Sequence, residues 1–170
     1  LFSGSAQPAN VQLSATAVAA VTPPQARLTL RSALATVDSS RAALLNPVIG
    51  GMLGGALNIG VASWQGLVDT KLNLLSYLDR LKTDLKITAV DYTQVLSTNV
   101  AVSQLIQSTI NLLQANGTLS TSSTIAGLQA LKLSAGSTTI KLGDLIQIQG
   151  GNNIAALGTD MSVFDLVQGL

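Results

Sequence analysis

The chain opens with two stretches in which hydrophobic and polar positions alternate. In NVQLSATAVAAV (Asn10–Val21), small and β-branched residues alternate with polar ones, which is typical of a strand. Pro23-Pro24 ends that strand. In QARLTLRSALATV (Gln25–Val37), leucines at even positions alternate with Arg and Thr. This spacing favours a second, half-buried strand, with a helix face as the alternative.

An uncharged run extends from Ala42 to Val68. Asp38-Ser39-Ser40 supplies N-cap chemistry for a helix over residues 41–53, and the alternation LNIGV over residues 57–61 predicts a strand. The run is long enough to cross a bilayer, but a proline, two glycine pairs and two asparagines interrupt it. We therefore expect a buried helix, a glycine break and a strand, with membrane insertion as the alternative.

The second half of the chain changes between strand-like and helical spacing of its apolar residues. Leucines and charged residues on opposite faces mark the clearest amphipathic helix, and a second helix ends at a C-terminal Asn-Gly pair. The expected elements are a strand over 67–74, a helix over 74–85, a helix over 103–114 ended by Asn116-Gly117, a short helix through Leu131 and a strand over 138–142.

These elements predict the fold class. We expect one α+β domain over residues 1–170, mostly an antiparallel sheet with aliphatic amphipathic helices packed on it. The Ser/Thr-rich segment 117–124 is the candidate sub-boundary within this domain.

One short pattern recurs along the chain. Two alternating apolar positions, two further positions, two apolar residues and Gln or Asp follow one another in VAVSQLIQ (100–107), IKLGDLIQ (140–147), MSVFDLVQ (161–168) and, more loosely, LNLLSYLD (72–79). The pattern predicts the end of a strand leading into a helix, with Ser103, Gly143 or Ser162 near the cap. The copies recur at irregular intervals, so the chain is not a regular solenoid. Convergence of strand-to-helix turns within one domain is the simplest explanation.

Composition limits the classes of partner. Apolar residues make up 47% of the chain and charged residues 10%, so we expect part of the exterior to be hidden against another protein, a membrane or a second copy. The alternative is a secreted domain whose surface is covered by Ser, Thr, Gln and Asn. Nine basic and eight acidic residues give a net charge of +1, which argues against a nucleic-acid partner.

The sequence contains few residues suited to catalysis. There is no His and no Cys, which excludes Ser–His arrangements and His or thiolate metal sites. All eight acidic residues are Asp, and they are scattered. No phosphate-binding or calcium-loop spacing occurs either. We therefore expect neither enzymatic activity nor a cofactor or metal ion.

Three segments resemble the TadG-like proteins of tight-adherence (Flp) pilus systems. They are the passage from Pro23 to Leu85, with its LLNPVIGGMLGG and WQGL elements, the run DYTQVLSTNVAVSQLIQSTINLL (91–113), and KLGDLIQI (141–148). The resemblance implies a bacterial, extracytoplasmic assembly component in the periplasm, cell envelope or cell surface. Its partners would be other pilus or envelope proteins. It also implies a membrane anchor, which would lie outside this fragment, and no catalytic residues.

Two surfaces are the candidates for such contacts. The first strand, Val11–Val21, would offer an unpaired edge to another chain, and the segment Leu44–Leu57 is the second candidate surface; self-association is among the partners considered. The alternative function, a secreted adhesin, predicts an exposed aromatic or polar binding face, for which Trp64 is the best aromatic candidate. The candidate interaction residues are Val11, Leu13, Ala15, Ala17, Leu44, Leu45, Val48, Met52, Leu53 and Trp64.

Overall fold

The computed structural model describes residues 36–88, 92–117, 122–146 and 157–170, and these residues form an α+β fold. Helices dominate it, and the strands are short. The elements are α1 (Ser39–Leu53), α2 (Val61–Asp69), β1 (Lys71–Asn73), α3 (Leu74–Asp84), α4 (Tyr92–Leu96), β2 (Asn99–Ala101), α5 (Val102–Ala115), α6 (Ser122–Ser134), β3 (Thr139–Lys141), α7 (Leu142–Leu145), β4 (Asp160–Ser162) and α9 (Val163–Gln168).

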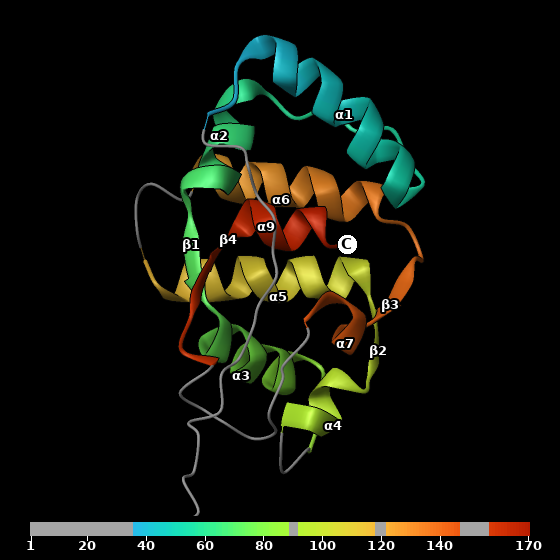
Figure 1. Cartoon of the computed structure of the whole chain (residues 1–170), viewed down its shortest axis with the longest axis vertical. Coiled ribbons are helices and arrows are strands. Elements are labelled where there is room, and N and C mark those ends of the chain that lie inside the picture. Colours follow the sequence, from blue (N-terminus) through green and yellow to red (C-terminus); the bar gives the residue numbers. More distant parts are fainter. Residues whose placement is uncertain (1–35, 89–91, 118–121, 147–156) are drawn as a thin grey trace, which may run out of the picture.

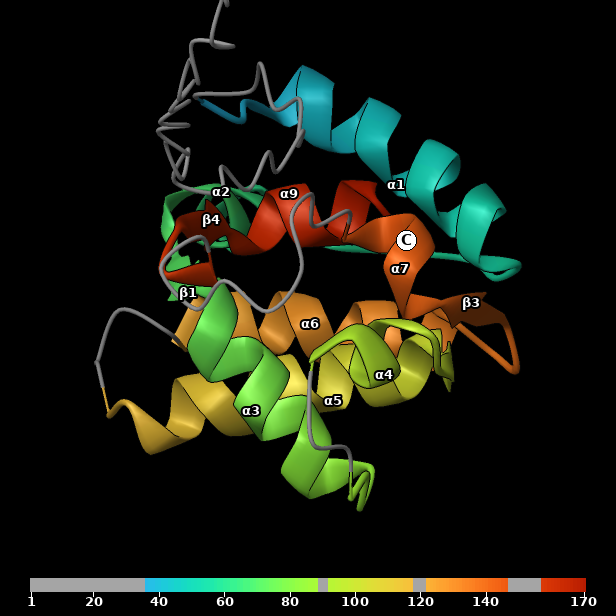
Figure 2. The same ribbon diagram turned by 60° about the horizontal axis from the view of Figure 1, so that its bottom comes forward.

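The helices are stacked in layers (Figure 1). α1 lies at one end of the stack, above α6. α2 packs against α6, and α9 packs against α2; α5 follows below α6, and α3 lies beyond α5. The view turned by 60° shows the same order, with α1 on the outside of the molecule (Figure 2). The most extensive helix contacts join α5 to α6, α2 to α6 and α3 to α5. The core therefore lies around α5 and α6.

The expectation of a mostly antiparallel sheet is wrong for the described residues. Their strands form two separate two-stranded antiparallel ribbons, β1 with β4 and β2 with β3. Each strand has three residues and continues directly into a helix. A strand that stops after three residues cannot extend into a broad sheet, so the helices supply most of the core.

The helices expected over 41–53, 74–85 and 103–114 are confirmed as α1, α3 and α5. Asp38 caps α1, because its carboxylate accepts a hydrogen bond from the Arg41 backbone N–H at 2.8 Å. At the end of α5, Asn116 is the C-cap and Gly117 adopts a positive φ of 65°. Capping residues and apolar spacing were therefore sufficient to predict these three helices.

The strand expected over 57–61 is wrong. Residues 56–60 form an irregular connection, and Val61 already begins α2. The strand expected over 67–74 is reduced to Lys71–Asn73, because residues 67–69 belong to α2. Packing of α2 on α6 explains both corrections: a Cβ at Gly127 of α6 would lie 3.3 Å from Ser63, so the two backbones approach closely.

The recurring pattern corresponds to a structural unit. All four copies are a three-residue strand followed at once by a helix: β1–α3, β2–α5, β3–α7 and β4–α9. In two units the N-cap lies two residues before the cap expected at Ser103 or Gly143, since the N-cap residues are Ala101 and Lys141. Ser162 is confirmed as an N-cap and forms a capping box with Asp165.

The four units pair in the same way. In each ribbon the first apolar residue of one copy faces the first apolar residue of the other: Leu72 faces Met161, and Val100 faces Ile140. In these four units, the first N–H of the helix donates to the carbonyl of a threonine that precedes the partner strand. These bonds are Leu74 to Thr159, Val163 to Thr70, Val102 to Thr138 and Leu142 to Thr98.

This pairing makes each ribbon pseudo-symmetric and satisfies a backbone donor that a helix start would otherwise leave free. Each copy of the pattern therefore pairs with another copy, through its strand and through the first N–H of its helix.

Several expectations lie outside the described residues. The first expected strand and nearly all of the second fall there, as do residues 118–121 of the expected linker. Val37, at the end of the second expected strand, is buried and donates its N–H to the Gln65 side chain at 2.8 Å. Among the described residues, none of the helices is both long and apolar enough to span a membrane.

Candidate functional site

Helix α1 is apolar on both faces. Its inner face buries Ala42, Ile49, Gly50 and Leu53 against the body of the protein. The helix ends at Gly54, which adopts a left-handed conformation with a φ of 82° and donates its N–H to the Gly50 and Gly51 carbonyls. Pro47 lies inside the helix and has no N–H for the preceding turn.

Asn46 joins α1 to the rest of the molecule. Its side-chain oxygen accepts hydrogen bonds from the Ile59 backbone N–H at 2.9 Å and from Trp64 Nε1 at 3.2 Å. Its side-chain nitrogen donates to the Ile59 carbonyl at 3.1 Å. The Asn46 amide thus satisfies the backbone N–H and carbonyl of Ile59 and the indole N–H of Trp64. These bonds fix the orientation of α1 relative to α2.

Two neighbouring glycines of α1 have opposite surroundings. A Cβ at Gly50 would lie 2.7 Å from the Gly55 carbonyl oxygen, so only glycine allows the returning chain to approach. A Cβ at Gly51 would meet nothing within 4 Å. Among the described residues, packing requires Gly50, whereas no contact explains Gly51.

The outer face of α1, defined here as Leu44, Pro47, Val48, Gly51 and Met52, carries no charge and no polar side chain. Leu44 is 68% exposed, Val48 58% and Met52 57%. These three side chains are spaced four residues apart and therefore form one continuous apolar stripe. Figures 1 and 2 both place α1 on the outside of the helix stack.

The sequence-based candidates separate into three groups. Leu44, Val48 and Met52 lie together on the outer face of α1, and Leu45 is half-buried. Leu53 and Trp64 are wrong as contact residues, because both side chains are buried in the core. The first-strand candidates Val11, Leu13, Ala15 and Ala17 lie outside the described residues.

Trp64 is a core residue of α2. Its side chain is completely buried, and its ring meets that of Phe164 edge to face with centroids 5.9 Å apart. Its Nε1 donates to Asn46, so the indole is satisfied without solvent or ligand. Trp64 is therefore not available as the exposed aromatic residue of an adhesin binding face.

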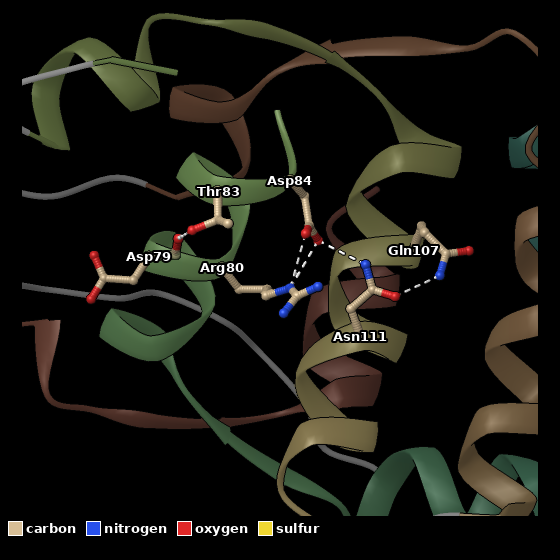
Figure 3. A network of polar contacts seen from close by, with 6 residues as sticks. All are labelled: Asp79, Arg80, Thr83, Asp84, Gln107 and Asn111. Atoms are coloured by element: carbon tan, nitrogen blue, oxygen red, sulfur yellow. Dashed lines mark hydrogen bonds and ion pairs between the residues drawn. The ribbon is translucent and has the colours of Figure 1, made fainter. Parts of the chain in front are cut away.

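A polar network crosses α3, α5 and α6 on another side of the molecule (Figure 3). Arg80 pairs with Asp84 at 2.9 Å on α3, and Asp84 accepts a hydrogen bond from Asn111 of α5 at 2.9 Å. Asn111 accepts in turn from Gln107 at 2.8 Å. On the same helix as Arg80, the Thr83 hydroxyl donates to the Asp79 carbonyl.

The network continues to α6. Lys132 Nζ donates to Gln107 Oε1 at 2.6 Å. Two open depressions adjoin the network. One of about 370 Å³ is lined by Gln107, Ile110, Gln114, Gln129, Lys132 and Leu133, and one of about 280 Å³ is lined by Asp84, Leu85, Gln104, Gln107, Ser108 and Asn111.

The sequence analysis missed this network, although Arg80–Asp84 and Gln107–Asn111 both have the four-residue spacing of helical side-chain pairs. The side chains of the network hydrogen-bond to one another, so the network holds the three helices together. Among the described residues, no group of three or more His, Cys, Asp or Glu side chains could hold a metal ion.

The network controls the charge of Asp84. Burial alone would raise the pKa of its carboxyl, but hydrogen bonds from Asn111, Ser108 and Arg80 and the Arg80 charge outweigh burial and hold the pKa below its ordinary value. Asp84 is therefore a stabilised carboxylate at neutral pH.

The pKa values of two tyrosine hydroxyls are raised rather than lowered. Burial raises the pKa of Tyr92 to about 12, helped by the hydrogen bond and the charge of Asp79. Burial also raises the pKa of Tyr77, whose hydroxyl donates to the Leu105 carbonyl. Neither group is prepared for proton transfer near neutral pH.

Comparisons with known proteins give a family without an assigned activity. A family model described as "Domain of unknown function (DUF8293)" matches residues 41–170, and the chain belongs to this family. No curated protein and no solved structure matches the chain. The matched region begins within α1 and includes all four strand–helix units.

Proposed function

We propose that this member of the DUF8293 family is a non-enzymatic assembly component that joins a larger complex through the outer face of α1. The observation that carries the proposal is the exposed stripe of Leu44, Val48 and Met52 on a helix whose other face is already buried. A helix that is apolar all round is normally covered on both sides. The covering surface on the outside is then supplied by another protein.

The composition of α1 supports contact with protein. Burial of apolar area contributes roughly 25 cal/mol per Å², so three large exposed side chains on one stripe offer a favourable docking surface. The face lacks charged groups, which would have to be desolvated or paired on association. Its boundary is polar, with Ser39, Ser40 and Arg41 at the N-terminal end.

The cellular setting follows from the sequence resemblance. The segment that resembles TadG-like proteins includes the whole of α1, so we place the chain in a tight-adherence pilus or another cell-envelope complex. In this setting it would act outside the cytoplasm, as a minor fibre subunit or as an anchoring part. Other pilus or envelope proteins would be its partners.

A charge introduced on the outer face tests the proposal. Val48→Asp places a carboxylate in the middle of the stripe, where the wild-type side chain is exposed and supports no core contact. Ala126→Asp is the matched control, because it adds the same charge at an exposed position of α6. Both variants are expressed in the native cells, and sheared fibres, membranes and medium are separated and examined by mass spectrometry.

The expected result is that wild type and Ala126→Asp occur in a high-mass complex with fibres or membranes, whereas Val48→Asp is released from it and retains its thermal midpoint. Wild-type assembly of Val48→Asp would contradict the proposal. Recovery of the wild-type chain as a free monomer in the medium would also contradict it and would favour the secreted adhesin.

A further inference from the structure

The outer face of α1 fits a second copy of the same helix. We infer that two chains associate through α1 in antiparallel orientation, around a twofold axis next to Pro47 and Val48. This inference rests on the proposed function and names the partner of the same surface. It starts from Gly51, a feature of the face that no contact among the described residues explains.

Gly51 is an unfavourable residue at its position. A glycine inside a helix costs roughly 0.5–1 kcal/mol relative to alanine. Gly51 lies within α1, and a Cβ there would meet nothing within 4 Å. The missing side chain leaves a notch in the stripe between Val48 and Met52, into which a side chain from outside can pack.

Antiparallel pairing places a side chain of the right kind in that notch. When Pro47 of one copy faces Val48 of the other, Leu44 of one copy faces Gly51 of the other, because facing positions run in opposite directions along the two helices. Twofold symmetry repeats the contact, so both notches are filled. Leu44 is 68% exposed in the single chain and is free to make this contact.

Charges are compatible with the same register. Between Ala42 and Val68 the chain has no charged residue, so no like charges meet along the paired stripes. Arg41, just before that run, would lie beside Gly54 of the second copy, at the carbonyl end of its helix. A cation near a helix C-terminus is stabilising, typically by about 0.3–1 kcal/mol.

The size of the face sets the strength of the association. A stable complex normally buries about 800 Å² on each partner, and a stripe of three large side chains on one helix provides less than that. An isolated pair is therefore expected to dissociate on dilution. Copies held close together in an assembly would pair through an effective concentration much higher than that in dilute solution.

Single cysteines can measure the register, since the natural chain contains no Cys. In the inferred pair, residue 48 of the two copies is offset by about 1.5 Å along the axis, whereas residue 52 is offset by about 14 Å. A disulfide requires Cα atoms within roughly 7 Å. The full chain is prepared as Val48→Cys and as Met52→Cys, with Ala126→Cys on α6 as the control for random collision, and each is oxidised mildly at high protein concentration.

The expected result is rapid formation of a covalent dimer by Val48→Cys, at least tenfold faster than by Met52→Cys or Ala126→Cys. Adding Gly51→Leu to Val48→Cys fills the notch and should return the rate to that of Ala126→Cys. Equal rates for Val48→Cys and Met52→Cys would overturn the antiparallel register. A Val48→Cys rate equal to that of the control would overturn self-pairing altogether.

The two proposals can fail separately. If Val48→Cys does not dimerise but Val48→Asp still leaves the native complex, a different subunit covers α1 and the proposed function stands. If Val48→Asp also remains in the complex, both fail. If Val48→Asp lowers the thermal midpoint of the isolated chain by more than about 5 °C, equivalent to roughly 1 kcal/mol or more, another part of the same chain covers α1 and self-pairing is overturned.

Discussion

Helices α1 and α5 are similar in length and poor in charge, but they differ in how the fold covers them. Both are uncharged within their apolar runs, and they have 15 and 14 residues. Nearly all large aliphatic side chains of α5 are buried, whereas three of those of α1 are exposed. The outward positions of α5 are mainly polar, and Gln107 and Asn111 tie it to α3 and α6.

This difference separates a helix that the monomer covers from one that it leaves open. α5 lies in the middle of the stack and has neighbours on several sides, whereas α1 lies at its end (Figures 1 and 2). Low charge alone therefore does not mark an interface. What marks α1 is that its outward residues are Leu, Val and Met, where α5 has Gln and Asn.

The same substitution in both helices gives the largest expected effect. Leu105→Ala in α5 empties a completely buried site and should lower the free energy of unfolding by about 2–5 kcal/mol. Leu44→Ala in α1 removes a side chain that is 68% exposed and should change the free energy of unfolding by less than about 0.5 kcal/mol. Denaturant unfolding of dilute protein measures both. Comparable losses would mean that the two helices are equally covered, which would remove the contrast.

Alanine substitution of two neighbouring glycines of α1 should change the stability of the chain in opposite directions. Gly50→Ala brings a Cβ within 2.7 Å of the Gly55 carbonyl oxygen and should destabilise the chain by about 1–2 kcal/mol. Gly51→Ala adds a methyl group in open space and should stabilise the dilute monomer by about 0.5–1 kcal/mol, because alanine favours the helix. Thermal melting of both variants measures the difference. A destabilising Gly51→Ala would show that the outer face of α1 is covered within the monomer.

Acidification tests the tie that holds α5 and should give the smallest effect. The folded-state pKa of Asp84 is held below its ordinary value, so its carboxylate stabilises the fold above about pH 4, and this contribution is lost as the pH falls through the folded-state pKa. Asp84→Asn should therefore flatten the fall in melting temperature below about pH 4, and the stability involved is less than about 1 kcal/mol.

The control for this titration is Asp144→Asn, which removes the same charge at an exposed position of α7. Its melting curves show how far the loss of one negative charge by itself changes the acid profile. If Asp84→Asn and Asp144→Asn flatten the profile equally, net charge rather than the network determines the acid response.

The fold could be predicted where local chemistry decides it. Asp38 before an apolar run, leucines at helical spacing after residue 74, and Asn116-Gly117 after another such run were sufficient for α1, α3 and α5. The same reasoning failed at residues 57–61, where a short alternating stretch suits a strand or a connection equally well. There Asn46 and the packing of α2 on α6 decided the outcome.

The candidate surface was predicted in part. The sequence named Leu44, Val48 and Met52 as contact candidates together with Leu45 and Leu53, but it could not say which face of an uncharged helix would be buried. Leu53 and Trp64 were assigned to the surface and lie in the core, because an all-apolar segment carries no polar stripe that would mark the side facing water.

The sequence by itself determined the capped helices, the α+β class and the recurrence of the strand–helix pattern, because these depend on residues close together in the chain. Only the tertiary structure decided that the copies pair as β1 with β4 and β2 with β3, that three helices share one polar network, and that α1 keeps an apolar face exposed. These features depend on residues brought together over long sequence separations, and no local spacing encodes which of several similar segments will meet.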